Sequence, residues 1–363
     1  MELTASEKAQ FASQGFVVLR GCLAEADLAP LDAAYEQRVA DVAERLVAQG
    51  RIRSDHSGLP HGRRLAALVE ELGPQAYDGF QIHELQGEWP EAFDLYQARL
   101  PAAFEFMFGE RLGAALESLL GTPELTVHPS QHVRPYLPRR GPGLPQPNQA
   151  AWHQDRVVYR READASQIVT CWCPLVDCDA NSGCLRMIPG VREMLQTVDA
   201  PDPDSAAESA EFDGQPSGIE PAALAAAGTP VDVPMKRGDV VLFSSLVPHA
   251  GLPNDSDRIR WSIELRFQAS GTPTGRPAHP EVVVRSADPT TVQRSYEEWS
   301  DRWVAALDAT RELTWQETLG EISGSVEWAE LWKQGRSEEV AARNRTIAEV
   351  DSRVGSPGTN SRL

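Results

Sequence analysis

The stretch Arg260-Trp-Ser-Ile-Glu-Leu-Arg-Phe267 alternates polar and apolar side chains with a period of two. Successive side chains of a β-strand point to opposite faces, so this period predicts a strand with one apolar and one polar face. The two faces are formed by Trp261, Ile263, Leu265 and Phe267, and by Arg260, Ser262, Glu264 and Arg266. We expect the polar face to line an interior and the apolar face to pack outward beneath helices, as in a jelly-roll with a ligand cavity.

Other short strands are predicted before this stretch. From Leu125 onward, apolar runs are separated by Gly, Pro, Asn and Asp, which is typical of an all-β sandwich or barrel. Residues 168–175 and 184–188 are predicted strands, and the turn-forming residues 179–183 between them predict a hairpin. The sequence therefore predicts a mainly β fold with a jelly-roll core at residues 125–270 and flanking helices.

Helices are expected on both sides of this core. Apolar residues recur at near-helical spacing from residue 27 to about residue 50. Residues 101–120 have the same character, and Gly121 ends that helix. Trp299 and Trp303 lie four positions apart on one predicted helix face, which is typical of a core or subunit contact.

We expect a single domain whose parts follow one another along the chain. They are an N-terminal strand and helices at 1–124, the jelly-roll core at 125–270, a helical, tryptophan-bearing extension at 289–351 and a disordered tail at 352–363. An acidic segment at 191–234 interrupts the core, and its stretch 199–213 holds six acids and no base. Because long loops inside compact domains are either functional or disordered, we expect this segment to be an insertion or a lid.

The composition indicates an ordinary globular protein of 363 residues. Its net charge of −19 argues against nucleic acid and anionic membrane surfaces as partners, because both require a cationic face. The five cysteines form no Cys-x-x-Cys pair and are expected to be small core residues in a reducing cytoplasm. There is neither a signal-peptide pattern nor a run of roughly 20 apolar residues, so we expect a cytoplasmic protein with no membrane partner.

Two histidines and one aspartate have the composition of a metal site. His153 and Asp155 are separated by one residue, and His249 ends an apolar run. Two imidazoles and one carboxylate form the facial triad of non-haem Fe(II) oxygenases, which leaves three coordination positions for substrate and dioxygen. These three residues are therefore the predicted iron ligands and catalytic residues. The rival pair His279 and Glu281 has no downstream partners and is expected to be structural or exposed.

Arg260 and Ser262 follow shortly after His249. A guanidinium binds a carboxylate through two parallel hydrogen bonds, and a hydroxyl adds a third, so the pair predicts a site for 2-oxoglutarate. Four residues that neighbour the predicted metal in sequence are expected to contact a small-molecule substrate: Gln154, Arg156, Arg160 and Arg161. The arginines favour an anionic handle on that substrate. The alternative is that they pair with nearby acids at the surface.

The chain resembles the phytanoyl-CoA dioxygenase family over roughly residues 8 to 270. The shared motifs are Trp152-His-Gln-Asp155, Val169-Thr-Cys-Trp172, Asn181-Ser-Gly-Cys-Leu185 leading to Pro189-Gly190, and His249 with Arg260 eleven positions later. The opening Gly15-Phe-Val-Val-Leu-Arg-Gly21 is also similar to that family. The resemblance implies a double-stranded β-helix, a cupin-like form of jelly-roll, and an enzyme that uses Fe(II), 2-oxoglutarate and dioxygen.

The resemblance also implies roles for single residues. The iron ligands would be His153, Asp155 and His249, and the 2-oxoglutarate contacts would be Arg260, Ser262 and Trp172. Where the family often has a lysine that contacts 2-oxoglutarate, this chain has Arg134, which keeps the charge but not the geometry. Where the family usually continues Pro-Gly with Ser or Thr and then His, Val191 and Arg192 stand here. That departure concerns the substrate rather than the metal.

These observations predict an Fe(II)- and 2-oxoglutarate-dependent dioxygenase that hydroxylates an aliphatic carbon of a small-molecule metabolite and releases succinate and CO2. Asp155 favours hydroxylation, because relatives that halogenate have a small residue there. Desaturation, ring formation and epimerisation would use the same site, and the sequence identifies neither the substrate nor the oligomeric state. Two other interpretations stay open, a non-catalytic jelly-roll binding protein and a metal-dependent enzyme without 2-oxoglutarate. The first leaves Arg260 as a costly unpaired interior charge.

Overall fold

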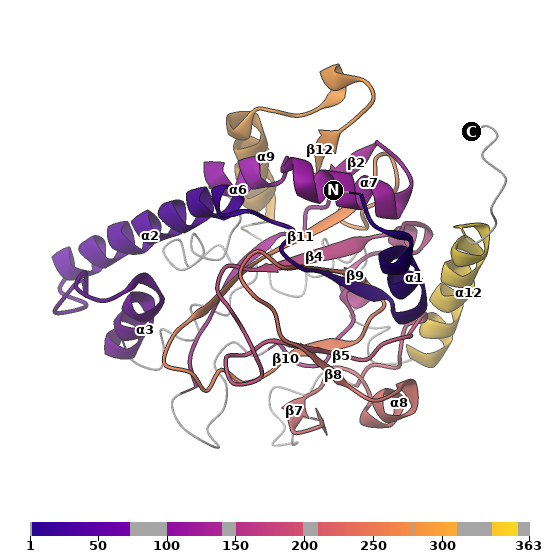
Figure 1. Ribbon diagram of the computed structural model, residues 1–363, viewed down its shortest axis with the longest axis horizontal. Coiled ribbons are helices and arrows are strands. Elements are labelled where there is room, and N and C mark those ends of the chain that lie inside the picture. The colour runs from indigo at the N-terminus through magenta and orange to yellow at the C-terminus, as the bar shows by residue number, and fades with distance from the viewer. Residues whose placement is uncertain are drawn as a thin grey trace.

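Two antiparallel sheets form the centre of the molecule, with helices packed around them (Figure 1). The computed structural model describes residues 2–72, 100–139, 150–198, 210–277, 279–310 and 336–354. The seven-stranded sheet has the order β1 (Phe16–Leu19), β9 (Val240–Ser244), β4 (Val169–Pro174), β11 (Arg260–Ala269), β2 (Leu125–Val127) and β12 (Val282–Arg285), with β3 (His132–Tyr136) also beside β11. The three-stranded sheet has the order β10 (His249–Gly251), β5 (Leu185–Met187) and β8 (Val231–Val233).

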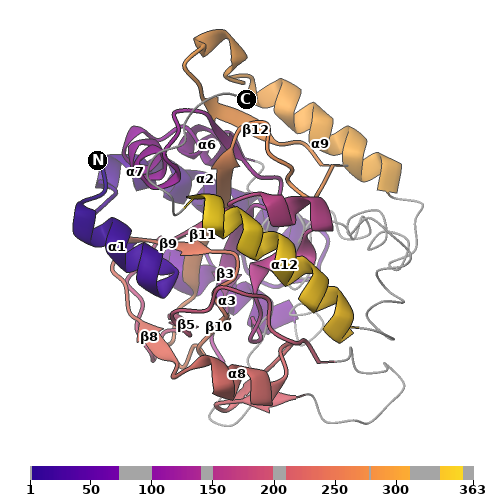
Figure 2. The ribbon, with the colours of Figure 1, turned by 90° about the vertical axis from the view of Figure 1, so that its right-hand side faces the viewer.

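The helices bury one face of the larger sheet in the main apolar core. This core receives side chains from α1 (Ala5–Gln14), α2 (Glu25–Ala48), α3 (His61–Leu72), α6 (Pro101–Phe106), α7 (Glu110–Leu120) and α9 (Tyr296–Thr310). Near the smaller sheet lie α8 (Pro221–Ala227) and the hairpin of β6 (Glu211–Phe212) and β7 (Gln215–Pro216) (Figure 1). The helix α12 (Arg336–Val354) contacts the short turn η2 (Arg161–Ala165) (Figure 2). A similar turn, η1 (Asp155–Val158), comes just before η2 in the chain, and η3 (Pro289–Thr291) precedes α9.

Strand β11 has the two faces that its period of two predicts. Its apolar side chains belong to the main core beneath the helices, where the rings of Trp261 and Tyr35 lie 5.7 Å apart. Its polar side chains are also buried, on the side that faces the smaller sheet, and they are Arg260, Ser262, Glu264 and Arg266. Burying a large apolar side chain contributes about 1.5–3 kcal/mol, so the apolar face fixes the register of this strand. The double-stranded β-helix with flanking helices is confirmed.

The predicted hairpin between residues 168–175 and 184–188 is wrong. Both strands exist, as β4 and β5, but they belong to different sheets. Strand β4 pairs with β9 on one edge and with β11 on the other, so neither edge is open to β5. The turn forms as expected, with Ser182 and Asp179 hydrogen-bonded to each other and Gly183 at a φ of 76°. It carries the chain from one sheet to the other.

The predicted helix at 101–120 is two helices, α6 and α7. The chain leaves the helical conformation at Gly109, which forms the N-cap of α7 with a ψ of 122°. Phe106 and Met107 are buried just before this break and anchor the corner in the main core. The longer helix predicted at 27–50 is confirmed as α2.

The remaining expectations have mixed outcomes. The five cysteines are free and buried. Trp299 and Trp303 of α9 lie in the main core. Residues 199–209 of the acidic segment lie outside the described residues, whereas the end of that segment supplies β8 to the smaller sheet. The expected tail at 352–363 lies outside the described residues except for its first three residues, which end α12. Within the described part of the chain, no helix is long and apolar enough to span a bilayer.

Candidate metal centre

The structure brings His153, Asp155 and His249 together. The two histidines form an antiparallel bridge through their backbones, with N···O distances of 3.0 and 2.9 Å. Asp155 begins η1, two residues after His153, and its Oδ1 lies 3.7 Å from Nε2 of His153 and 4.0 Å from Nε2 of His249. The ligand atoms of the three residues all lie within 4.8 Å of one another, and among the described residues they are the group that could hold a metal ion.

Both imidazoles present Nε2 to the centre of this group. Nδ1 of His153 donates to the carbonyl of Ala151 at 2.7 Å, and Nδ1 of His249 donates to the carbonyl of Val247 at 3.0 Å. A carbonyl only accepts, so the proton of each neutral ring is on Nδ1 and the lone pair is on Nε2. Burial, with a smaller effect of the neighbouring imidazole of His249, lowers the pKa of His153 to about 4. The His153 ring is therefore neutral at pH 7, as a metal ligand must be.

Asp155 is held by two residues that the sequence did not single out as site residues. Arg266 donates from Nη2 to Oδ1 at 2.8 Å and from Nε to Oδ2 at 3.1 Å, and the hydroxyl of Thr170 donates to Oδ2 at 2.6 Å. Burial opposes ionisation of this carboxyl, but the Arg266 charge outweighs burial and holds the pKa of Asp155 well below its usual range. The carboxylate is thus charged and fixed with Oδ1 toward the two imidazoles. Arg266 belongs to the polar face of β11, and its place in that alternating pattern is the sequence feature that could have identified it.

Arg260 is a buried guanidinium that no carboxylate in the described part of the chain balances. It is 4% exposed, its Nη1 donates to the hydroxyl of Ser262 at 3.2 Å, and its Nε has no hydrogen-bond partner. Its charge lies over the rings of Tyr136, at 4.4 Å, and Trp172, at 5.1 Å. Burial lowers the pKa of Arg260, yet a guanidinium keeps its proton at pH 7. An unpaired buried cation is costly, so this geometry fits an anionic ligand.

The sequence did not identify Tyr136 as part of this group. Its hydroxyl is buried without a hydrogen-bond partner among the described residues, and Tyr136 pairs in register with Arg260 across β3 and β11. Gly183 packs against its ring, where a Cβ would approach to 2.7 Å. The Asn-Ser-Gly motif therefore leaves room for this tyrosine. Only the strand register reveals the contact, and the sequence does not give that register.

Two donor sets now lie in one interior, a His-Asp-His group beside the smaller sheet and a buried arginine with two hydroxyls on β11 and β3 of the larger sheet. Residues 11–262 match the family model described as phytanoyl-CoA dioxygenase (PhyH). The chain belongs to the phytanoyl-CoA dioxygenase family. The cofactors of this family are Fe(II), 2-oxoglutarate and dioxygen, and two imidazoles with one carboxylate are the donor set that suits Fe(II). No curated protein matches the chain.

Solved structures of similar fold share little sequence with this family member. AviO1 from Streptomyces viridochromogenes Tue57 is 19% identical, with 75% of this chain and 98% of that chain covered and a TM-score of 0.43. EvdO2 from Micromonospora carbonacea var. aurantiaca, complexed with 2-oxoglutarate, is 18% identical, with 81% and 98% covered and a TM-score of 0.42. The epimerase SnoN, in complex with Fe3+, alpha ketoglutarate and nogalamycin RO, is 20% identical, with 74% and 86% covered and a TM-score of 0.40.

Arg134, which stands where the phytanoyl-CoA dioxygenase family often has a lysine, lies in the same interior. It pairs in register with Ser262, and its Nε lies 3.8 Å from a carboxylate oxygen of Glu264. Glu264 is also bonded to Arg266. Burial raises the pKa of Glu264, but the charges of Arg266 and Arg134 outweigh burial and lower that pKa. Arg134 is thus near Arg260 and Ser262 but shares its charge with an acid, unlike Arg260.

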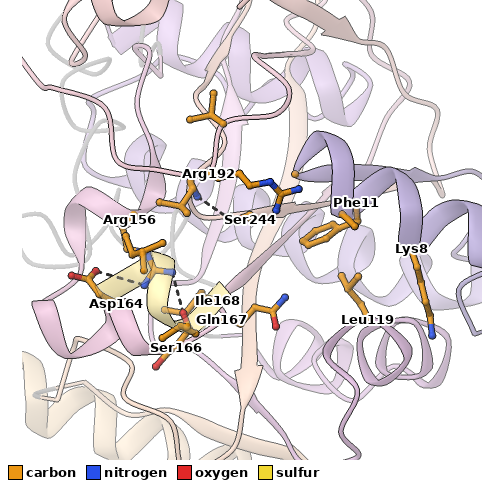
Figure 3. A pocket seen from close by; sticks show the side chains of 16 residues that line it. Lys8, Phe11, Leu119, Arg156, Asp164, Ser166, Gln167, Ile168, Arg192 and Ser244 are labelled. Carbon is orange, nitrogen blue, oxygen red and sulfur yellow. Dashed lines mark hydrogen bonds and ion pairs between the residues drawn. The ribbon is translucent and has the colours of Figure 1, made fainter. Parts of the chain in front are cut away.

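Two of the residues expected to contact the substrate are committed to internal bonds. Gln154 is fully buried; it donates to the carbonyls of Glu193 and Leu246 and accepts from the backbone of Leu195. Arg156 is 4% exposed and donates to the hydroxyl of Ser245 and to the carbonyls of Ala163 and Ser166. Figure 3 shows Arg156 beside Ser166. We therefore correct their assignment, because both side chains are buried and bonded to other parts of the protein. Arg161 is exposed and Arg160 is half-buried, and their substrate role stays a prediction.

A separate cavity of about 320 Å3 lies behind the turns that follow Asp155 (Figure 3). Its wall includes Arg156 and Asp164 from these turns, Phe11 from α1 and Ile347 from α12. None of the three metal-binding candidates lines it. Arg192, one of the two residues that replace the family's usual Ser or Thr and His, opens onto this cavity rather than onto the metal centre.

Proposed function

We propose that this protein is an Fe(II)- and 2-oxoglutarate-dependent dioxygenase that hydroxylates an aliphatic carbon of a small molecule, with release of succinate and CO2. The observation that carries the proposal is the buried Arg260, which lacks an acidic partner among the described residues, in the same interior as His153, Asp155 and His249. Without an anionic ligand, this buried cation would lower the stability of the fold and have no function to explain it.

The chain's own residues would bind and orient the reactants. His153, Asp155 and His249 would hold Fe(II), which supplies the activation of dioxygen when bound. Arg260 would bind the distal carboxylate of 2-oxoglutarate, with the hydroxyls of Ser262 and Tyr136 as further donors and the ring of Trp172 as a wall. Arg266 and Thr170 would keep Asp155 charged and turned toward the metal. Such positioning decides which substrate carbon reacts.

The finer assignments are also proposals. The carboxylate at Asp155 favours hydroxylation over halogenation. Desaturation, ring formation and epimerisation would use the same residues and are distinguished by the product. The substrate would be a small molecule, and an anionic handle would now involve Arg160 and Arg161 but not Arg156. The five buried free cysteines suit a reducing cytoplasm.

The test is anaerobic addition of Fe(II) and then 2-oxoglutarate to metal-free protein, with visible absorption as the readout. A charge-transfer band should appear in the wild type and not in His153→Ala. Co-substrate turnover, measured as succinate release, then allows candidate substrates to be screened. A folded protein that binds Fe(II) but gives no band with 2-oxoglutarate would support a metal-dependent enzyme without this co-substrate. A protein that binds neither would support the binding-protein alternative.

A further inference from the structure

The segment that follows Asp155 is held by side-chain donors as well as by its backbone. Residues 155–165 contain the two short turns η1 and η2 rather than strands, and some of their carbonyls accept from arginine side chains in addition to backbone N–H groups. Arg156 is one of these donors, to the carbonyl of Ala163 within the segment and to that of Ser166 just after it. The other donors come from a distant part of the chain.

The C-terminal helix α12 supplies them through Arg343. This side chain is 3% exposed and binds both oxygens of the buried Asp164, with Nε and Nη2 each at 2.7 Å. Its Nη2 also donates to the carbonyls of Arg156, at 3.2 Å, and Tyr159, at 3.0 Å. Arg156, whose carbonyl accepts this bond, is the residue directly after the metal-ligand candidate Asp155. One side chain therefore fixes both turns.

The next residue of α12 contacts a second segment, the one whose backbone binds Gln154. Asn344 accepts from the backbone N–H of Met194 at 2.7 Å and donates to the carbonyl of Met194 at 3.0 Å. The residues on either side of Met194 are bonded to Gln154, which lies between His153 and Asp155. Ile347, one turn further along α12, packs against Met194 and Leu246. The helix thus holds the His153-Gln-Asp155 segment from both sides.

We propose that Arg343, Asn344 and Ile347 form a C-terminal clasp that positions the metal ligands, with Arg343 as the principal positioning residue. The clasp lies beyond residues 11–262, the part of the chain that matches the family model. Affinity for the metal then depends on a helix outside that part. The inference rests on the metal centre of the proposed function. It adds residues that lie outside that centre and hold the segment that carries two of its ligands.

The test is a titration of metal-free protein with Co(II), followed by the visible d–d bands that report the geometry of the bound ion. Arg343→Ala should raise the Co(II) dissociation constant about tenfold or more and change the d–d spectrum, as is usual when a residue that orients a metal ligand is lost. Arg343→Lys keeps the charge but not the paired contacts with Asp164, and should have an intermediate effect. The matched control is Arg345→Ala, because Arg345 is exposed on the same helix.

A purely structural role for α12 would give a different result. Arg343→Ala would then lower the thermal unfolding midpoint of the metal-free protein while leaving the Co(II) affinity and the d–d spectrum unchanged, and that outcome would overturn the proposal. If Arg343→Ala does not fold, Asn344→Ala serves instead, with an expected rise in the dissociation constant of about threefold; no rise would again overturn the proposal. A wild type that binds no Co(II) would overturn the metal centre itself, and the clasp with it.

Discussion

Arg260 is the residue whose substitution tests the site most directly, because its charge is buried and no described carboxylate balances it. Arg260→Ala should raise the 2-oxoglutarate concentration for half-saturation roughly 10- to 100-fold, since hydrogen bonds to charged groups contribute about 1.5–3 kcal/mol. Titration of the anaerobic Fe(II) protein with 2-oxoglutarate measures this. Arg260→Met should leave the unfolding midpoint of the ligand-free protein unchanged or higher, because it removes an unpaired cation. Unaltered 2-oxoglutarate binding in Arg260→Ala would move the co-substrate site elsewhere.

Tyr136 tests the same site through a neutral group. Its hydroxyl has no hydrogen-bond partner in the described structure, so Tyr136→Phe should cost the ligand-free protein little stability. The variant should nevertheless weaken 2-oxoglutarate binding by about threefold to tenfold, the value of one hydrogen bond. Tyr35→Phe is the control, because Tyr35 packs against the opposite face of β11 at Trp261. Equal affinities for the two variants would exclude Tyr136 from the site.

His279 offers a prediction about pH. It is 5% exposed, its ring stacks on that of Trp303 at 5.2 Å, and neither ring nitrogen has a hydrogen-bond partner in the part of the chain that the structure describes. Burial, with a smaller effect of Arg276, lowers the pKa of His279 to about 4. Since the unfolded chain binds this proton near pH 6.5, stability should be full above that pH and should fall as the pH falls toward 4.

His279→Phe removes that titration while keeping the ring. The free energy of unfolding of the wild type should fall by up to about 2 kcal/mol more than that of His279→Phe between pH 6.5 and pH 5. Urea unfolding at the two pH values gives both differences. Parallel losses in the two proteins would show that His279 is protonated in the folded state after all.

At the scale of elements, the tight turn before β9 is bonded to the segment between β1 and α2. Gly238 has a φ of 91°, and its carbonyl accepts from the backbone of Leu23. A Cβ at this position would lie 2.8 Å from the carbonyl oxygen of Leu23. The turn therefore requires glycine for two reasons, its left-handed backbone and the close approach of another chain segment.

Gly238→Ala should lower the free energy of unfolding by about 3 kcal/mol, which adds a steric clash to the conformational cost. Gly271→Ala separates the two effects. Its φ of 79° is similar, but no atom of the described residues lies within 4 Å of the added Cβ, so a loss of only about 1–2 kcal/mol is expected. Denaturant unfolding of both variants measures the difference. Equal losses would mean that the contact with Leu23 relaxes at no cost.

Elements also show where prediction from sequence succeeds and where it stops. A period of two predicted both faces of β11, because alternation depends on backbone geometry alone. Turn chemistry located the bend at 179–183 but not the partners of the strands that it joins, since pairing depends on which edges are already occupied. The contact between Tyr136 and Arg260 likewise follows from a register that only the assembled sheet defines.

On the scale of the whole molecule, donor chemistry predicted the residues that come together better than it predicted their neighbours. The three metal-binding candidates were named from residue type and spacing, and the structure places their ligand atoms within 4.8 Å of one another. Gln154 and Arg156 looked like substrate contacts because they are adjacent in sequence. Their hydrogen bonds instead go to residues of loops and turns inside the protein. These residues are distant in sequence, so the local sequence pattern does not reveal the contacts.

The position of the clasp along the chain has a consequence for biosynthesis. Arg343 leaves the ribosome after all three metal-binding candidates, roughly 10–40 s later than His153 at ordinary rates of translation. A nascent chain therefore displays its imidazoles and carboxylate well before the helix that steadies them has been made. Capture of iron with full affinity then becomes one of the last events in the making of this protein, and it coincides with the docking of α12.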